Sequence, residues 1–167
     1  MAWCTTTMWA GMQFKRVAAL IVADGRARRA RSEKGIKQYV PLGGDAVIAH
    51  GVRCCVAHPL VDFVQVVIHA DDEALYREAL AGVARDKVQA PVTGGKTRQE
   101  SVRLGLEALA AHAPSAVLIH DAARPFIDAA AIDGVLGALA TAPGAIVAVP
   151  VVIVYEFDRD ELRERLA

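Results

Sequence analysis

Residues 16–22 read RVAALIV, a continuous apolar run of alanine, leucine, isoleucine and valine behind one arginine. Such a run is typical of a strand that is buried on both faces of a parallel sheet. Comparable runs at 63–68, 87–92, 116–119 and 145–149 predict four further strands. Because helical segments separate them, the sequence predicts βαβ units and an α/β fold with a three-layer, doubly wound, mainly parallel sheet.

Capping residues predict where the helices begin. Asp45 is expected to cap a helix over 46–57, and Asp128 to cap another. Thr97 and Glu100 have the T-x-x-E spacing of a capping box, which predicts a third helix. The apolar face of that helix is expected to contain Val102, Leu106 and Leu109.

The composition narrows the class of protein. The chain has 167 residues, of which 54% are hydrophobic and 23% charged, as expected for one globular domain. Its formal net charge is zero, so no overall attraction to nucleic acid or to a membrane is expected. No apolar run is long enough to cross a bilayer. Three cysteines without framework spacing argue against a disulfide scaffold and for a cytoplasmic protein.

Ligands of an open parallel sheet bind beyond the C-terminal ends of its strands, and the loop after the first predicted strand suits a phosphate group. The small residues Ala23, Asp24 and Gly25 form a turn, and a basic stretch with Arg29 and Lys37 follows. Backbone N–H groups and cations of this kind bind phosphates. The spacing is neither that of a Walker A loop nor G-x-G-x-x-G, so a solvated basic surface loop is the alternative.

The loop after the third predicted strand is a second candidate. Gly94 and Gly95 precede the helix that carries Arg98 and Ser101. The glycines would let a ligand approach the helix N-terminus, within reach of the Ser101 hydroxyl. An ordinary capped helix behind a glycine turn is the alternative.

The segment HDAARP, residues 120–125, follows the fourth predicted strand. An aspartate such as Asp121 at the tip of a central strand commonly holds Mg²⁺ beside a nucleotide phosphate. Ala122 would leave room for a sugar. The alternative is an aspartate that caps a turn and pairs with Arg124.

Together, these segments resemble those of the 2-C-methyl-D-erythritol 4-phosphate cytidylyltransferase family. The resemblance extends from about residue 16 to residue 150, and HDAARP and GG-x-x-R-x-x-S-V are its most specific motifs. The matching segments are AALIVADGRARR (18–29), KQYVPLGG (37–44), VTGGKTRQESVRLGLEAL (92–109) and VLIHDAARPF (117–126).

The resemblance implies a Rossmann-like nucleotidyltransferase fold. It also implies transfer of CMP from CTP to methylerythritol phosphate, with release of pyrophosphate and Mg²⁺ as cofactor, in the non-mevalonate pathway of isoprenoid biosynthesis. Arg29 and Lys37 would be the catalytic cations on the triphosphate, and Asp121 would hold the metal. Gly95 and Ser101 would face the cytosine. The full implied nucleotide-binding set is Ala23, Asp24, Gly25, Gly94, Gly95, Arg98, Ser101 and Ala122.

One departure from the family concerns the first loop, which is normally A-A-G-x-G-x-R. Asp24 stands in place of its second alanine, and Ala27 in place of its second glycine. The carboxylate of Asp24 would add negative charge close to the bound nucleotide.

The resemblance also implies the domain organisation. Residues 1–14 are expected to be a disordered N-terminal extension, 15–150 the nucleotidyltransferase domain, and 151–167 an atypical C-terminal strand and short helix. The match covers about the first two thirds of a family member, so the expected fold is C-terminally incomplete and the acceptor-binding part is unmatched.

The expected partners are CTP and a polyol phosphate, and a homodimer is a further expectation. Two alternatives stay open. One is a non-catalytic or degenerate α/β nucleotide-binding fragment. The other is a cytidylyltransferase that acts on another polyol phosphate.

Overall fold

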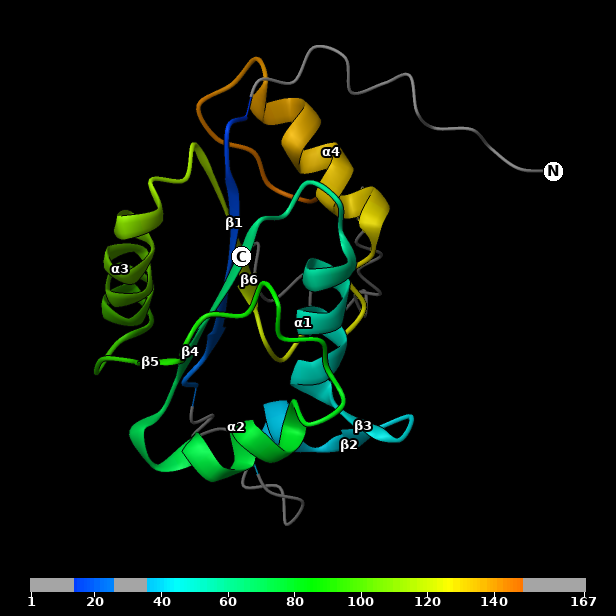
Figure 1. Cartoon of the computed structure of the whole chain (residues 1–167), viewed down its shortest axis with the longest axis vertical. Helices are drawn as coiled ribbons and strands as arrows, with labels where there is room; N and C mark the ends of the chain where they lie inside the picture. Colours follow the sequence, from blue (N-terminus) through cyan, green and yellow to red (C-terminus); the bar gives the residue numbers. More distant parts are fainter. Residues whose placement is uncertain (1–13, 26–35, 149–167) are drawn as a thin grey trace, which may run out of the picture.

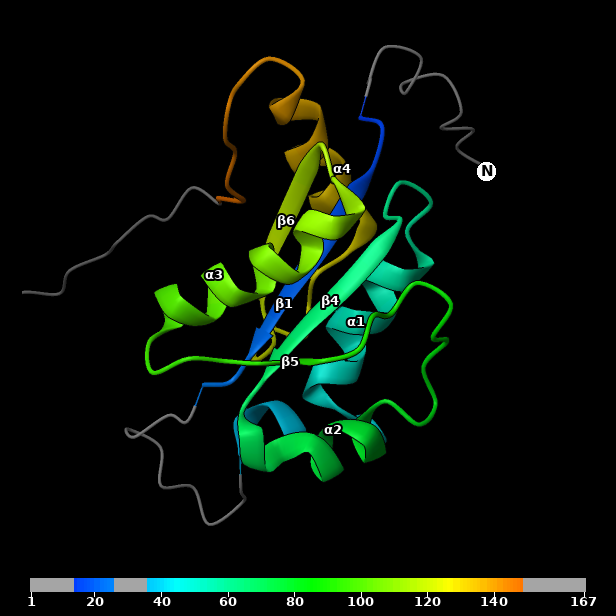
Figure 2. The same ribbon diagram turned by 60° about the vertical axis from the view of Figure 1, so that its left-hand side comes forward.

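The computed structural model describes residues 14–25 and 36–148. Its central sheet is parallel and has the order β5-β4-β1-β6. The four strands are β1 (Val17–Ala23), β4 (Phe63–Ile68), β5 (Val92–Thr93) and β6 (Ala116–Asp121). The helices α1 (Val47–Ala57) and α4 (Ala129–Leu139) cover one face of the sheet, and α3 (Arg98–Leu109) covers the other (Figures 1 and 2). The predicted three-layer, doubly wound α/β fold is therefore confirmed.

Smaller elements gather at one end of the molecule. Figure 1 shows α2 and the β2–β3 hairpin beyond the C-terminal ends of β1 and β4. These elements are α2 (Glu73–Ala79), β2 (Pro41–Leu42), β3 (Asp45–Ala46) and the 3-10 helices η1 (Lys37–Tyr39) and η2 (Ala70–Asp72). The 3-10 helix η3 (Ala110–His112) follows α3 at the opposite end, where Arg16 donates to the His112 carbonyl. Gly43 and Gly44 make the hairpin turn with positive φ angles of 62° and 95°, which glycine adopts without strain.

Strand β1 forms the centre of the core because it has a strand on each side and helices on both faces. All seven of its residues are buried. Ala19 and Ile21 pack in the larger apolar cluster with α1 and α4, whereas Ala18 and Leu20 pack in the cluster that contains Leu109 of α3. This alternation is the two-residue period of a strand.

Helix α3 approaches the sheet closely through a glycine. Its predicted apolar face is confirmed at Leu109 and Val102, which pack in the cluster with β1, and is wrong at Leu106. Its buried residues are Ser101, Gly105 and Leu109, whereas Leu106 is 37% exposed. A Cβ atom at Gly105 would clash with Leu20 and would lie 2.8 Å from Val67 Cγ2. The helix therefore rotates so that its smallest residue, rather than Leu106, faces the sheet.

The strand predicted over 87–92 is mostly wrong. Only Val92–Thr93 forms a strand, while Val88 makes an isolated bridge to Val64. Between them, Pro91 has no N–H group to donate, and the Gln65 side chain donates to the Ala90 carbonyl at 2.7 Å. A side chain thus replaces part of the backbone ladder.

Two other expectations are corrected. Asp45 does not cap α1, because it lies in β3 and binds Arg53 at 3.0 Å, and Ala46 is the N-cap residue. Residues 145–148 contain no strand, and Ile146 is 87% exposed. In contrast, the caps predicted at Thr97 and Asp128 are confirmed, since each side chain accepts a backbone N–H of its helix.

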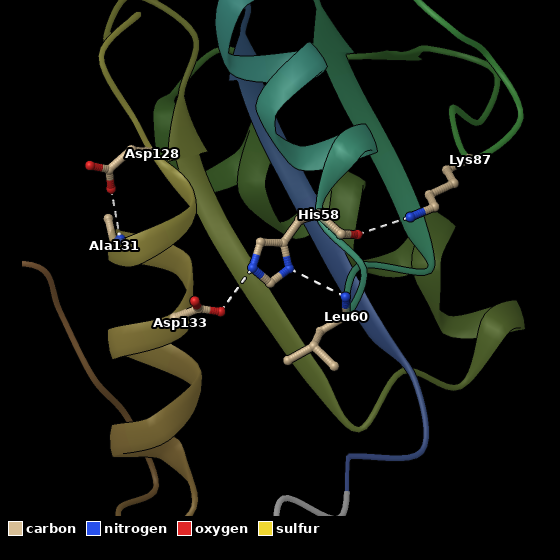
Figure 3. Close-up of polar contacts among 6 residues, drawn as sticks. All are labelled: His58, Leu60, Lys87, Asp128, Ala131 and Asp133. Atoms are coloured by element: carbon tan, nitrogen blue, oxygen red, sulfur yellow. Dashed lines mark hydrogen bonds and ion pairs between the residues drawn. The ribbon is translucent and has the colours of Figure 1, made fainter. Parts of the chain in front are cut away.

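His58 connects the end of α1 to α4, as Figure 3 shows. Its buried ring lies 2.9 Å from Asp133, measured from Nε2 to Oδ1. The backbone N–H of Leu60 donates to Nδ1 at 3.3 Å, so the ring proton resides on Nε2 and is donated to Asp133. The Lys87 ammonium group donates to the backbone carbonyl of His58 at 2.9 Å and so also holds the C-terminal end of α1.

The expectations for the two chain ends fall mostly outside the described residues. Residues 1–13 and 149–167 lie there, while Phe14 is half-buried against the core. None of the described helices has the length and apolar character that a membrane span requires.

Candidate nucleotide-binding site

A cavity of about 1140 Å³ lies where β1 and β6 end and α3 begins. The chain continues from β1 to β4 on one side of β1, whereas β6 pairs on its other side, with Val22 opposite Asp121. Reversal of strand order next to β1 creates the crevice in which open α/β sheets bind ligands. The predicted site residues that line this cavity are Ala23, Asp24, Gly25, Lys37, Gly95, Arg98, Asp121 and Ala122.

Asp121 is held at the tip of β6 by two arginines. Arg98 donates to Oδ1 from Nε at 3.1 Å and from Nη2 at 2.8 Å. Arg124 lies farther away, with Nε 3.5 Å from Oδ2. The carboxylate remains 36% exposed, so a ligand can reach it. The α3 helix thus supplies the closer partner, which sequence spacing did not suggest.

The turn after Asp121 is fixed by His120. The His120 Nε2 atom lies 2.9 Å from the Arg124 carbonyl, and the Arg124 N–H donates to the Asp121 carbonyl at 3.0 Å. Burial lowers the pKa of His120, which favours the neutral ring. A Cβ on Gly51 of α1 would lie 3.2 Å from this ring, so a glycine leaves room for it. His120 therefore positions the turn that carries Asp121 and Arg124.

Asp24 and Ser101 join the end of β1 to the first turn of α3. The buried Ser101 hydroxyl is hydrogen-bonded to the Asp24 carboxylate, and the Gly95 N–H donates to Ser101 Oγ at 2.9 Å. A Cβ on Gly94 would lie 2.6 Å from Asp24 Oδ2, so a side chain at Gly94 would displace the carboxylate. The two glycines therefore serve this hydrogen-bond network.

The capping box predicted at the start of α3 is present in altered form. Thr97 Oγ1 accepts the Glu100 N–H at 3.1 Å, as predicted. Glu100, however, accepts the N–H of Lys96 at 2.8 Å rather than that of Thr97. The consequence is that the backbone just before the helix is fixed together with its first turn.

Gln38 is a site residue that sequence analysis missed. It is 3% exposed, and its side-chain amide donates to the carbonyl of Ala23. This hydrogen bond ties η1 to the end of β1 and brings Lys37 to the cavity. Gln38 is the neighbour of Lys37 in the KQYVPLGG segment, and this position could have indicated that it belongs to the site.

The cavity is lined by more cations than carboxylates among the described residues. Arg98, Arg124, Lys37 and Lys96 outnumber Asp24 and Asp121 by four to two. Lys96, Thr97, His69 and Arg124 line it without having been predicted as site residues, although all of them except His69 belonged to motifs that were singled out. Arg29 lies outside the described residues. The balance of charge suits an anionic ligand.

Asp121 fits the usual way in which proteins hold Mg²⁺ beside a nucleotide. Within residues 14–25 and 36–148, no group of three metal-binding side chains occurs. Mg²⁺ at nucleotide sites needs only one or two carboxylates, since phosphate oxygens and waters complete its shell. An exposed carboxylate in a cation-lined cavity provides that donor.

The sheet order, the crevice beside β1 and its charged lining define a Rossmann-like nucleotidyltransferase fold. The sequence profile of the family described as IspD, 2-C-methyl-D-erythritol 4-phosphate cytidylyltransferase, matches residues 17–155. The chain therefore belongs to this family.

Curated relatives support the assignment. The chain is 54% identical over 135 residues to the bifunctional enzyme IspD/IspF of Mesorhizobium japonicum. It is 49% identical over 136 residues to the enzyme of the same name from Rhodospirillum rubrum. Each match covers 81% of this chain but only 33% and 35% of the relative, so the chain spans about a third of their length.

Solved structures agree with the fold. A 4-diphosphocytidyl-2C-methyl-D-erythritol synthase superposes with a TM-score of 0.68 at 28% identity, covering 87% of this chain and 64% of that one. The synthase of the same name from Anaerococcus prevotii superposes with a TM-score of 0.59 at 27% identity, covering 76% of this chain and 52% of that one.

Proposed function

We propose that this chain binds CTP in the cavity beside β1 and takes part in transfer of CMP to 2-C-methyl-D-erythritol 4-phosphate, with release of pyrophosphate. The observation that carries the proposal is the cation-lined cavity at the strand-order reversal, which contains Asp121, Arg98 and Lys37. Family membership and the names of the relatives supply the substrates.

In this proposal, the triphosphate lies near Lys37, Arg98 and Arg124, with Arg29 as a further catalytic cation. The acceptor phosphate attacks the α-phosphate of CTP and pyrophosphate leaves, so no covalent nucleophile of the protein is needed. The cations neutralise charge that develops on the phosphates. Gly95 and Ser101 mark the end of the cavity proposed for the base.

We propose that Asp121 holds Mg²⁺ together with phosphate oxygens of the nucleotide. Bound Mg²⁺ would supply neutralisation of the triphosphate charge. Arg98 contacts Oδ1 of this carboxylate and Arg124 contacts Oδ2, so both hold Asp121 at the cavity.

The proposal extends to location and assembly. We propose a reducing cytoplasm as the location, because Cys54 and Cys55 are free thiols. A homodimer is proposed because β6 has no strand on its outer side within the described residues, and Ile119 of this strand is 48% exposed.

A second candidate function is nucleotide binding without turnover. It is favoured by the coverage, since the chain spans about a third of the curated relatives and none of the residues described here forms a proposed acceptor site. Transfer to another polyol phosphate is open for the same reason.

The test is CTP binding by calorimetry, followed by pyrophosphate release with CTP, Mg²⁺ and methylerythritol phosphate. We expect CTP to bind, with Mg²⁺ strengthening the affinity at least about tenfold in the wild type but not in Asp121→Asn. Release that requires the acceptor supports transfer. Binding without release supports the second candidate, and absence of CTP binding by folded protein contradicts both.

A further inference from the structure

His120 lies beside the nucleotide cavity but does not line it, whereas residues 121–124, which follow it, all do. Consecutive residues of a strand point to opposite faces of the sheet. Asp121 accordingly contacts Arg98 of α3 on one face. The His120 ring lies next to Gly51 of α1 on the other face. A ligand in the cavity therefore reaches Asp121 without touching His120.

The His120 side chain holds the far end of the turn that follows β6. A carbonyl oxygen can only accept a hydrogen bond, so Nε2 of His120 is the donor in its 2.9 Å contact with the Arg124 carbonyl. The Arg124 N–H donates to the Asp121 carbonyl at 3.0 Å. Both backbone polar groups of Arg124 therefore fix the turn, and His120 supplies the partner of one of them.

The position of Arg124 is important because its side chain contacts the carboxylate that we propose as the metal ligand. Its Nε atom lies 3.5 Å from Asp121 Oδ2, whereas Arg98 binds Oδ1. Without the hydrogen bond from His120, the turn would lose the contact that places Arg124 beside this carboxylate. Loss of an outer partner of a metal ligand typically weakens metal binding about 10- to 100-fold.

Gly51 leaves just enough room for the His120 ring. An added Cβ atom would lie 3.2 Å from Nε2 and 3.3 Å from Cδ2 of the ring. Both distances are shorter than ordinary van der Waals contact, so a side chain at position 51 would push the ring. The nearest ring atom is the nitrogen that donates to Arg124, so this hydrogen bond depends on the residue at position 51.

We infer that His120 is a positioning residue, held in place beside Gly51, that sets the affinity of the site for the complex of CTP with Mg²⁺. The inference rests on the function proposed above. His120 acts through the turn, because its ring fixes the Arg124 carbonyl and Arg124 in turn contacts Asp121. It needs no contact with the nucleotide or the metal, and no change in the charge of its ring.

The test replaces His120 by two amides that differ in reach. In His120→Gln the side-chain amide nitrogen can lie close to the place of Nε2, whereas in His120→Asn it lies near the place of Nδ1 and falls short of the Arg124 carbonyl. Calorimetry with CTP and Mg²⁺ should give a dissociation constant about tenfold higher for His120→Asn, but within about threefold of the wild type for His120→Gln. Amide hydrogen exchange at Arg124 in the nucleotide-free protein should be faster in His120→Asn only. Urea unfolding shows that each variant is folded.

Gly51→Ala tests the support of the ring from α1. It should raise the same dissociation constant about two- to fivefold in the chain that has His120, and should add nothing in His120→Gln, where the ring is absent. Gly137→Ala in α4 is the matched control, because a Cβ there would meet no atom within 4 Å, and it should leave the constant unchanged. An equal effect of Gly51→Ala in both backgrounds overturns the part assigned to Gly51.

The failure of this inference and that of the proposed function give different results. If folded His120→Gln and His120→Asn bind CTP with Mg²⁺ equally well, the inference is overturned, while the binding itself leaves the proposed function standing. If the folded wild type binds no CTP in the presence of Mg²⁺, the proposed function fails and the inference falls with it.

Discussion

At the scale of single residues, His58 shows how the protonation of one buried ring is fixed by its neighbours. Because Leu60 donates to Nδ1, the ring is the neutral Nε2–H form, and Asp133 needs only to accept a hydrogen bond. Asparagine offers the same acceptor. The contact of α4 with the end of α1 therefore rests on a neutral hydrogen bond rather than on an ion pair.

We accordingly predict that Asp133→Asn changes the free energy of unfolding by less than about 0.5 kcal/mol. His58→Ala should lower it by about 2 to 3 kcal/mol, since it removes a buried ring and two hydrogen bonds. Urea unfolding at neutral pH measures both values. A loss for Asp133→Asn as large as that for His58→Ala would contradict a neutral hydrogen bond.

At the scale of an element, α3 brings the site together because it packs closely on β1 and β4. Its first turn carries Arg98, which binds Asp121 at the end of β6. It also carries Ser101, which binds Asp24 just after β1. Gly105, one turn further on, sets the distance between the helix and the sheet. The position of the site thus depends on Gly105, which does not itself line the site cavity.

Substitution of Gly105 by alanine should lower the free energy of unfolding by about 1 to 3 kcal/mol, because the new methyl group clashes with Leu20 and Val67. The same change at Gly134 in α4, where a Cβ would meet no atom within 4 Å, should raise it by up to about 1 kcal/mol through helix propensity. Denaturant unfolding of the two variants tests this pair. Stabilisation by both substitutions would mean that α3 has room to move away from the sheet.

At the scale of the whole molecule, the outer edge of β6 pairs with no other strand of the described residues. A groove of about 750 Å³ lies along it, between β6, α4 and residues 142–147. Ile119 is 48%, Ile146 87% and Val147 64% exposed. Unpaired strand edges beside apolar side chains favour association with another strand.

The proposed homodimer therefore predicts that the sedimentation mass of the chain rises with concentration between about 1 and 100 µM. Ile119→Lys should keep the chain monomeric over that range, because a lysine at the edge opposes strand pairing. Leu75→Lys, an equal change at a 39% exposed leucine of α2, should not. A wild-type mass that stays at that of one chain over the whole range would exclude the dimer.

Most elements of the fold could be predicted because their signals are local. The runs 16–22 and 63–68 form buried strands, and Thr97 and Asp128 cap their helices as expected. The strand predicted at 87–92 is mostly wrong, because a proline and the side chain of Gln65 interrupt the ladder. On α3, only Leu106 was placed wrongly, because Gly105 makes the closest approach to the sheet. Neither interaction can be predicted from the hydrophobic periodicity of a single segment.

The sequence by itself determined the order of strands and helices, and with it which loops lie at the C-terminal edge of the sheet. Only the tertiary structure decided the pairing of Ser101 with Asp24, 77 positions apart, and of Arg98 with Asp121, 23 positions apart. The physical reason is that apolar runs and caps act between near neighbours in the chain. A contact across elements depends on strand register and on how closely a helix can approach the sheet.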